Sequence, residues 1–187
     1  MTLGLRTCLL ALVGLLFCCP VVLGQEAKSA SVARLVTRFT PATTTAASVS
    51  PSFAEAGSIE QRAFEQTNHV RVQNGLPALE WDTDACRMAR SHSESMFRLN
   101  YFSHVTPDGL RLRDRARAAG ILTFKVLAEN IAYNQGYEDP GAFAVERWMA
   151  SPKHRANILS TEFRAMAIGT YVAADGSVFL TQTFITR

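Results

Sequence analysis

Two histidines lie in segments that favour a functional imidazole. His104 is found in Phe102-Ser-His-Val-Thr-Pro107, and His154 is found in Ser151-Pro-Lys-His-Arg155. The nearby prolines predict a loop or the first turn of a helix, where side chains often bind or react. An imidazole in such a place can transfer a proton or bind a metal ion.

A single carboxylate interrupts an apolar segment between them. Glu129 stands in Val126-Leu-Ala-Glu-Asn-Ile131, which its apolar residues predict to be a strand. A carboxylate that is buried or half-buried there needs a cation or a metal ion as its partner. Because 25 positions separate Glu129 from each of the two histidines, spacing alone does not show that the three residues meet.

The other candidate side chains have simpler structural interpretations. His69 is expected on the first helix, solvated or packed, and His92 is expected as a hydrogen-bonded histidine on the apolar face of the second helix. The sequence holds no His-Glu-x-x-His, Gly-x-Ser-x-Gly or glycine-rich phosphate loop. Four alternating arginines predict a solvated helix face, with contact to anionic envelope polymers as the alternative: Arg111, Arg113, Arg115 and Arg117.

The elements that must position these residues alternate between helix and strand. A capping box at Ser58-Ile-Glu-Gln61 predicts the start of the first helix, and Asp82 and Asp139-Pro140 predict the N-caps of later ones. The turn at Asp175-Gly176 predicts a C-terminal hairpin, so the fold class is α/β (α+β) with a mixed or antiparallel sheet. The expected helices cover 58–74, 83–96, 110–119 and 140–148, with a helical turn after Pro152, and the expected strands cover 125–133, 165–172 and 178–185.

The first part of the chain has the composition of an export signal and a tether. Arg6, the uncharged apolar run to Leu23 and the small residue Gly24 predict a secretory signal peptide over 1–24. A membrane anchor is the alternative, but the run is short and contains Pro20. Residues 25–57 are rich in Ser, Thr, Ala and Pro and are expected to be a disordered linker, which leaves a domain over 58–187.

Charge and cysteine content exclude several classes of protein. The 187 residues carry a formal net charge of only +3, without the concentrated basic stripe of nucleic-acid binding proteins. Removal of the signal peptide leaves Cys86 alone, so a disulfide framework and a dithiol redox site are both excluded for the mature chain. Cys86 is expected as a small buried residue of the second helix, with a reactive thiol or an intermolecular disulfide that dimerises the protein as the alternatives.

Three blocks of sequence together resemble a known family. They are Tyr101-Phe-Ser-His104, Ala128-Glu-Asn-Ile131 and Trp148-Met-Ala-Ser-Pro-Lys-His-Arg-Ala-Asn-Ile-Leu159, and in this order they resemble the signature blocks of the CAP superfamily. This family, also called the SCP domain, comprises cysteine-rich secretory, antigen-five and pathogenesis-related proteins. The resemblance covers about residues 59–187 and is nearest to the disulfide-free, bacterial-type branch.

The resemblance implies a fold and a site. The fold is a three-layer α-β-α sandwich with a central mixed or antiparallel sheet and a C-terminal β-hairpin. The cleft would contain His104, Glu129, Asn130, Ser151 and His154, and the family pattern implies that His104, Glu129 and His154 can hold zinc or another divalent cation. Ser151 stands where eukaryotic members carry a second acid, so the alternative is a hydrogen-bonded polar cluster without metal.

Two functions follow as expectations. The first is a secreted, monomeric binding module without catalysis, whose partner is an envelope polymer, a lipid or a protein. Nucleic acid and a stable membrane anchor are not expected. The alternative is a zinc-dependent hydrolase that acts on peptide or cell-envelope bonds through a metal-activated water.

Overall fold

The computed structural model describes residues 52–187, so the predicted signal peptide and residues 25–51 of the predicted linker lie outside the described residues. The first helix, α1, spans Ser52–Gln73 and begins ahead of the predicted cap at Ser58. The capping-box residues are therefore inside the helix, and 52–57 are helical rather than linker. No helix in this part of the chain is long and apolar enough to cross a membrane.

The remaining elements follow the predicted order, with boundaries shifted by a few residues. Asp82 and Asp139 act as the predicted N-caps, since their side chains accept hydrogen bonds from the backbone of Ala85 and Ala142. The elements are β1 (Glu80–Trp81), α2 (Thr83–Arg98), α3 (Leu112–Ala118), β2 (Val126–Gln135), α4 (Pro140–Ala150), α5 (Pro152–Ile158), β3 (Ala165–Val172) and β4 (Ser177–Thr186).

These strands form a four-stranded mixed sheet in the order β1-β3-β4-β2. The short strand β1, which sequence patterns did not predict, pairs in parallel with β3. β3 and β4 form the predicted hairpin, and β2 pairs with β4 in antiparallel fashion from Val126↔Thr186 to Gln135↔Ser177. β2 is therefore an edge strand, and one long side of it faces away from the sheet.

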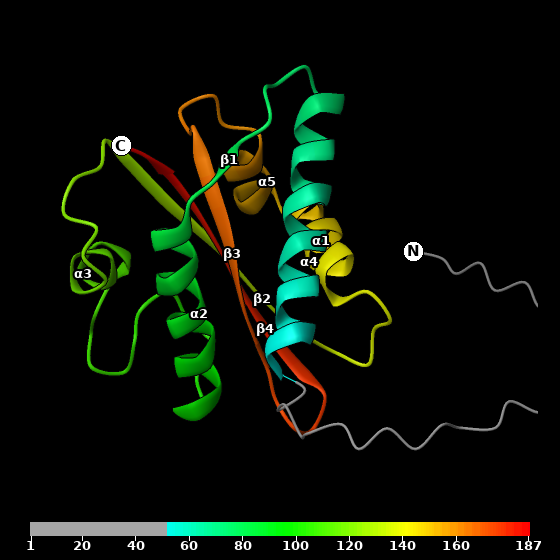
Figure 1. The fold of residues 1–187 in the computed structure, drawn as a ribbon, viewed down its shortest axis with the longest axis vertical. Coiled ribbons are helices and arrows are strands. Elements are labelled where there is room, and N and C mark those ends of the chain that lie inside the picture. Colours follow the sequence, from blue (N-terminus) through cyan, green and yellow to red (C-terminus); the bar gives the residue numbers. More distant parts are fainter. Residues whose placement is uncertain (1–51) are drawn as a thin grey trace, which may run out of the picture. The chain divides into compact units, whose positions relative to one another are not determined.

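Helices cover both faces of the sheet, as the predicted three-layer sandwich requires. Figure 1 shows α2 and α3 on one side of the strands and α1, α4 and α5 on the other. Alternation along each strand divides its side chains between the two faces. Gly169 of β3 faces α2, where a Cβ would overlap the backbone of Ala89 and Arg90, so only glycine allows this close approach.

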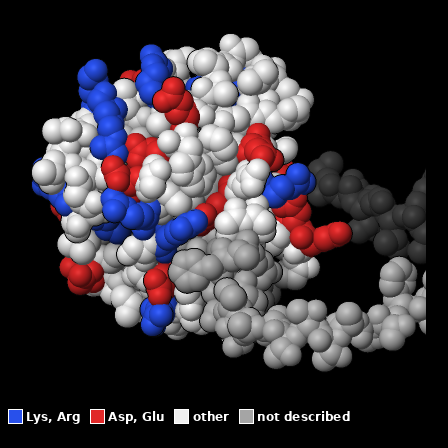
Figure 2. Space-filling model, viewed as in Figure 1, with Lys and Arg blue, Asp and Glu red and all other residues white. Residues whose placement is uncertain are grey.

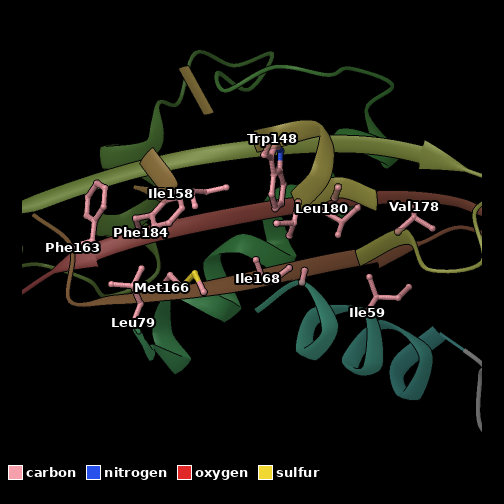
Figure 3. Packing of buried hydrophobic residues seen from close by; sticks show 13 residues of the cluster. Ile59, Leu79, Trp148, Ile158, Phe163, Met166, Ile168, Val178, Leu180 and Phe184 are labelled. Carbon is pink, nitrogen blue, oxygen red and sulfur yellow. The ribbon is translucent and has the colours of Figure 1, made fainter. Parts of the chain in front are cut away.

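The main hydrophobic core lies between the sheet and the layer of α1, α4 and α5 (Figure 3). Trp148 of α4 is 1% exposed and its indole N–H donates to the carbonyl of Ile131, so it anchors the core as its aromatic size favours. The predicted apolar stripe of α2 is also buried and faces the opposite side of the sheet: Ala85, Met88, Ala89, His92 and Met96. Cys86 is buried as predicted, and burial raises the pKa of its thiol to about 11.

Charged side chains do not gather by sign on the face seen in Figure 2, where basic and acidic groups lie next to one another. Several of them form surface ion pairs, such as Arg187 with Asp82 and Arg98 with Glu94. Exposed pairs of this kind contribute little stability. This intermixing agrees with the even charge balance of the sequence.

Candidate functional site at the edge of the sheet

Two consecutive residues of the edge strand β2 build the two halves of the site. Side chains alternate along a strand, so Glu129 points to the α2 and α3 side of the sheet and Asn130 to the α1, α4 and α5 side. The Glu129 carboxylate hydrogen-bonds to the ring of His104, and the Asn130 side chain donates a hydrogen bond to the backbone carbonyl of His154. The dipeptide Glu129-Asn130 therefore connects the His104 loop and the helix α5 to the same point of the sheet edge.

Both carboxylate oxygens of Glu129 are occupied. His104 Nδ1 lies 2.9 Å from Oε1, and Arg115 Nη2 donates to Oε2 at 2.6 Å. The Glu129 side chain is only 3% exposed. Burial alone would raise the pKa of this carboxyl, but the hydrogen bond from His104 and the charges of Arg115 and His92 outweigh burial and hold the pKa below its usual value. Glu129 is therefore an anion in the folded protein.

Arg115 is the cation that the buried carboxylate requires, and its position corrects the sequence-based expectation. Arg111, Arg113 and Arg117 are exposed as predicted, but Arg115 of α3 is buried. Its Nη1 also donates to the carbonyl of His104 at 2.8 Å, so one guanidinium holds both the acid and the histidine loop. The sequence does carry a signal for this burial, because Arg115 lies in line with the apolar residues of its helix.

His104 presents one ring nitrogen to its surroundings. Because Glu129 is ionised, it accepts the hydrogen bond, and Nδ1 of His104 carries the proton. In the neutral form of the ring, the other nitrogen, Nε2, then holds a free lone pair. The His104 side chain is 51% exposed, and in the described part of the chain Nε2 has no hydrogen-bond partner. This nitrogen can accept a proton or a hydrogen bond, or bind a cation.

His92 is a core histidine, as predicted, but it lies next to the site. Its Nε2 hydrogen-bonds to the carbonyl of Ser103 and its Nδ1 to the hydroxyl of Tyr101. Nε2 also lies 3.8 Å from Glu129 Oε1. Burial lowers the pKa of His92 to about 4 even though the charge of Glu129 opposes this, so His92 is neutral at physiological pH. It fixes the backbone just before His104.

A chain of buried amides fixes the other half of the site. Asn130 Nδ2 donates to the His154 carbonyl and to Gln182 Oε1, and Asn157 Nδ2 donates to Asn130 Oδ1. Gln182 Nε2 continues the chain to the hydroxyl of Thr67 on α1. Asn157 also donates to the carbonyl of Glu129, an edge-strand acceptor. These bonds lock α5, and with it His154, against β2.

His154 and Ser151 line a hollow of about 300 Å³ beside β2, together with Phe102, Tyr133 and Arg147. Burial, and then the charge of His104, lower the pKa of His154, so the two imidazoles interact electrostatically. Ser151 lies at the junction of α4 and α5, where its backbone caps α4. The structure thus places His104 beside Glu129, and the backbone of His154 beside Asn130, at one edge of the sheet, with Ser151 and His154 lining the same hollow.

The predicted zinc ligands are not gathered as a three-ligand cluster in the described structure. Structural and catalytic zinc sites use three or four protein ligands. Among residues 52–187, no group of three or more His, Cys, Asp or Glu side chains is arranged to hold a metal ion. Both carboxylate oxygens of Glu129 already accept hydrogen bonds, one from His104 and one from Arg115. The predicted set of His104, Glu129 and His154 therefore stays a prediction, and the geometry gives Glu129 the role of orienting His104.

Comparison with known proteins connects this site to a family. Residues 64–184 match the family model "CAP: Cysteine-rich secretory protein family". Two Bacillus subtilis (strain 168) proteins are similar: "Uncharacterized membrane protein YlbC", 39% identical over 68% of this chain and 34% of the relative, and "Uncharacterized protein YkwD", 33% identical over 86% of this chain and 64% of the relative. The chain therefore spans about one third of the length of YlbC and somewhat less than two thirds of the length of YkwD.

A solved structure agrees with the sequence match. An extracellular protein containing a SCP domain from Bacillus anthracis str. Ames superposes with a TM-score of 0.61 and 34% identity, over 71% of this chain and 41% of that chain. The α-β-α layers thus agree with the fold that the resemblance of the sequence blocks implied. The chain belongs to the CAP, or cysteine-rich secretory protein, family.

Proposed function

We propose that this CAP domain acts outside the cell as a binding module whose ligand contacts His104 and His154 at the open edge of β2. The extracellular location is supported by the predicted signal peptide over 1–24 and by the extracellular SCP-domain protein that this chain resembles. The binding role is supported by the geometry of the two histidines.

One observation carries the proposal. His104 Nε2 and the ring nitrogens of His154 make no hydrogen bond to another group of residues 52–187, although the backbone of both segments is firmly held. Polar side chains that are already held in place lose less conformational entropy when a ligand binds to their open hydrogen-bonding atoms. The partly buried His154 and the hollow beside it give such a ligand a place to lie.

Catalysis has less support from the same atoms. A hydrolase that attacks through a serine, threonine or cysteine needs that side chain next to its base. In the described region, no serine, threonine or cysteine side chain hydrogen-bonds to His104 or His154. Ser151 shares the hollow with His154 but makes no such bond. A two-imidazole arrangement can hold a hydrogen-bonded ligand without a third protein ligand, so the binding module does not depend on zinc.

Cosedimentation tests this proposal. Cell envelopes isolated from the organism that encodes the chain are mixed with the full chain and pelleted, and the bound fraction is measured by blotting. We expect wild-type protein to pellet and the double variant His104→Gln/His154→Gln to lose most of its binding. His69→Gln is the matched control, because His69 is exposed on α1 and away from the cleft.

Two results would contradict the proposal. Wild-type protein that stays in the supernatant is not an envelope-binding module. Equal pelleting of the double variant, with unchanged thermal unfolding, shows that binding does not use the histidines. Peptide or glycosidic bond cleavage that needs added zinc and is lost in the same variant would instead support the hydrolase alternative.

A further inference from the structure

A second, larger hollow lies on the α2 side of the sheet near the β3–β4 turn. Its volume is about 620 Å³, within the range of ligand pockets. The strand register places Tyr171, Phe179 and Tyr133 side by side on one face of β3, β4 and β2. Phe97 of α2 stacks on Tyr171, and Tyr133 lies 5.0 Å from Phe179 between ring centroids. Of these rings, Phe97, Tyr133 and Phe179 line the hollow, so its wall is aromatic.

The two hollows are adjacent. Phe102 and Tyr133 line both the aromatic hollow and the smaller hollow that contains His154 and Ser151. These two rings are 52% and 50% exposed, unusual values for aromatic side chains of a small domain. Together the two neighbouring hollows extend from the β3–β4 turn, past Phe102 and Tyr133, to His154. We call the pair the aromatic groove.

The charge of the aromatic groove limits the class of its ligand. In the described chain, its ionised side chains are Asp175 at one end and Arg147 at the other, with His154 beside Arg147. The Ser177 hydroxyl donates to Asp175, and this bond lowers the pKa of that carboxyl. A single cation does not suit a phosphate-rich polymer, which binds through rows of Lys and Arg. A neutral ligand fits this balance.

We propose that the aromatic groove binds an uncharged glycan chain, which names the ligand class of the binding module proposed above and rests on that function. The C–H groups on one face of a pyranose ring carry partial positive charge and pack on the electron-rich face of an aromatic ring. Its hydroxyl groups remain free to hydrogen-bond at the rim, where Asn100, the Tyr133 hydroxyl and Ser151 lie. A lipid chain would leave the half-exposed rings partly in water, since it offers no polar edge to this rim.

The length of the aromatic groove also favours a chain over a single sugar. The larger hollow alone can hold more than one sugar ring, and the groove continues to His154. The free nitrogens of His104 and His154 would then receive hydroxyl or acetamido groups of the last ring. Phe102 and Tyr133 lie midway and are positioned to stack on the rings between.

Titration calorimetry with two probes tests the proposal: the β-1,4-linked hexasaccharides of glucose and of N-acetylglucosamine, added to the full chain. We expect at least one of them to bind, and Phe102→Ala and Tyr133→Ala each to weaken that binding about tenfold, as loss of a stacked ring does. Tyr133→Phe keeps the ring and should bind within about threefold of wild type. The matched control is Leu122→Ala, because Leu122 is 74% exposed and lies outside the groove.

The outcomes separate this inference from the function on which it rests. Absence of binding by both hexasaccharides, or equal affinity of the ring variants and Leu122→Ala, overturns the glycan assignment. So does tighter binding of polyphosphate or of an extended peptide that depends on the same rings. If the envelope cosedimentation still depends on His104 and His154, the binding module stands and only its ligand class is wrong. If neither assay detects binding, both proposals fall.

Discussion

Replacement of Arg115 by methionine tests whether this residue supports the site. Methionine keeps much of the apolar stem and removes the charge, which leaves Glu129 buried at 3% exposure with only His104 as a partner. Removal of one partner from a buried ion pair costs about 3–5 kcal/mol. With a urea dependence of about 2 kcal/mol per molar, the unfolding midpoint should fall by roughly 2 M.

The assay is urea unfolding of the full chain at pH 7, followed by circular dichroism. Arg117→Met is the matched control, because Arg117 is exposed on the same helix and should change the free energy of unfolding by less than about 0.5 kcal/mol. Addition of Glu129→Gln to Arg115→Met removes the unpaired charge. The double variant should therefore lose less free energy of unfolding than the two single variants lose together, and the difference, which is the coupling energy, should be about 2 kcal/mol.

The pH dependence of the stability tests the same ion pair in a second way. The pKa of Glu129 is lowered in the wild type, so its contribution is present above the unfolded pKa and is lost as pH falls through the folded pKa. Without Arg115 the Glu129 carboxyl is protonated more easily. The difference in the free energy of unfolding between wild type and Arg115→Met should therefore narrow below about pH 4. A cost under about 1 kcal/mol at pH 7, or a difference that widens in acid, would refute the reasoning.

Three further predictions concern residues around the site. His92 has a pKa of about 4 when folded, so stability should fall by about 3 kcal/mol as pH drops from 6.5 to 4, and urea unfolding of His92→Gln should show a shallower fall; an equal slope contradicts this. Gly169→Ala should push α2 from the sheet and lower stability by about 3 kcal/mol or more in thermal unfolding, and an unchanged melting temperature would show that α2 can move freely. In a chain without residues 1–24, where Cys86 is the single cysteine, Cys86 should react with Ellman's reagent only after unfolding, because it is buried with a raised pKa, and rapid labelling of that native chain would disprove its burial.

Much of the fold could be predicted from local patterns. The caps at Asp82 and Asp139 and the turn at Asp175-Gly176 act over a few residues, and the structure confirms them. The two-residue strand β1 could not be predicted, because it exists only through its parallel pairing with β3. The predicted start of α1 at Ser58 was wrong. A capping box marks only a possible N-terminus of a helix, and this helix continues upstream of it to Ser52.

The site shows the same division between local and long-range information. An apolar segment around Glu129 correctly indicated a buried carboxylate, and it left two partners open, a cation or a metal ion. The structure supplies the cation, Arg115. Alternation with three other arginines hid this role, since a charge on a short helix is solvated in most cases. The amide chain through Asn130, Gln182 and Asn157 joins residues far apart in sequence, and no local pattern predicts such a network.

The proton on His104 offers the most direct test of the central claim, that buried Glu129 orients His104 and leaves Nε2 free for a ligand. Two-bond ¹H–¹⁵N correlation spectra of the labelled full chain distinguish the imidazole tautomers at pH 9, where imidazole rings are neutral. We predict that His104 carries its proton on Nδ1 and that Glu129→Gln mixes the two tautomers. A His104 ring protonated mainly on Nε2, or one unaffected by Glu129→Gln, would contradict the account.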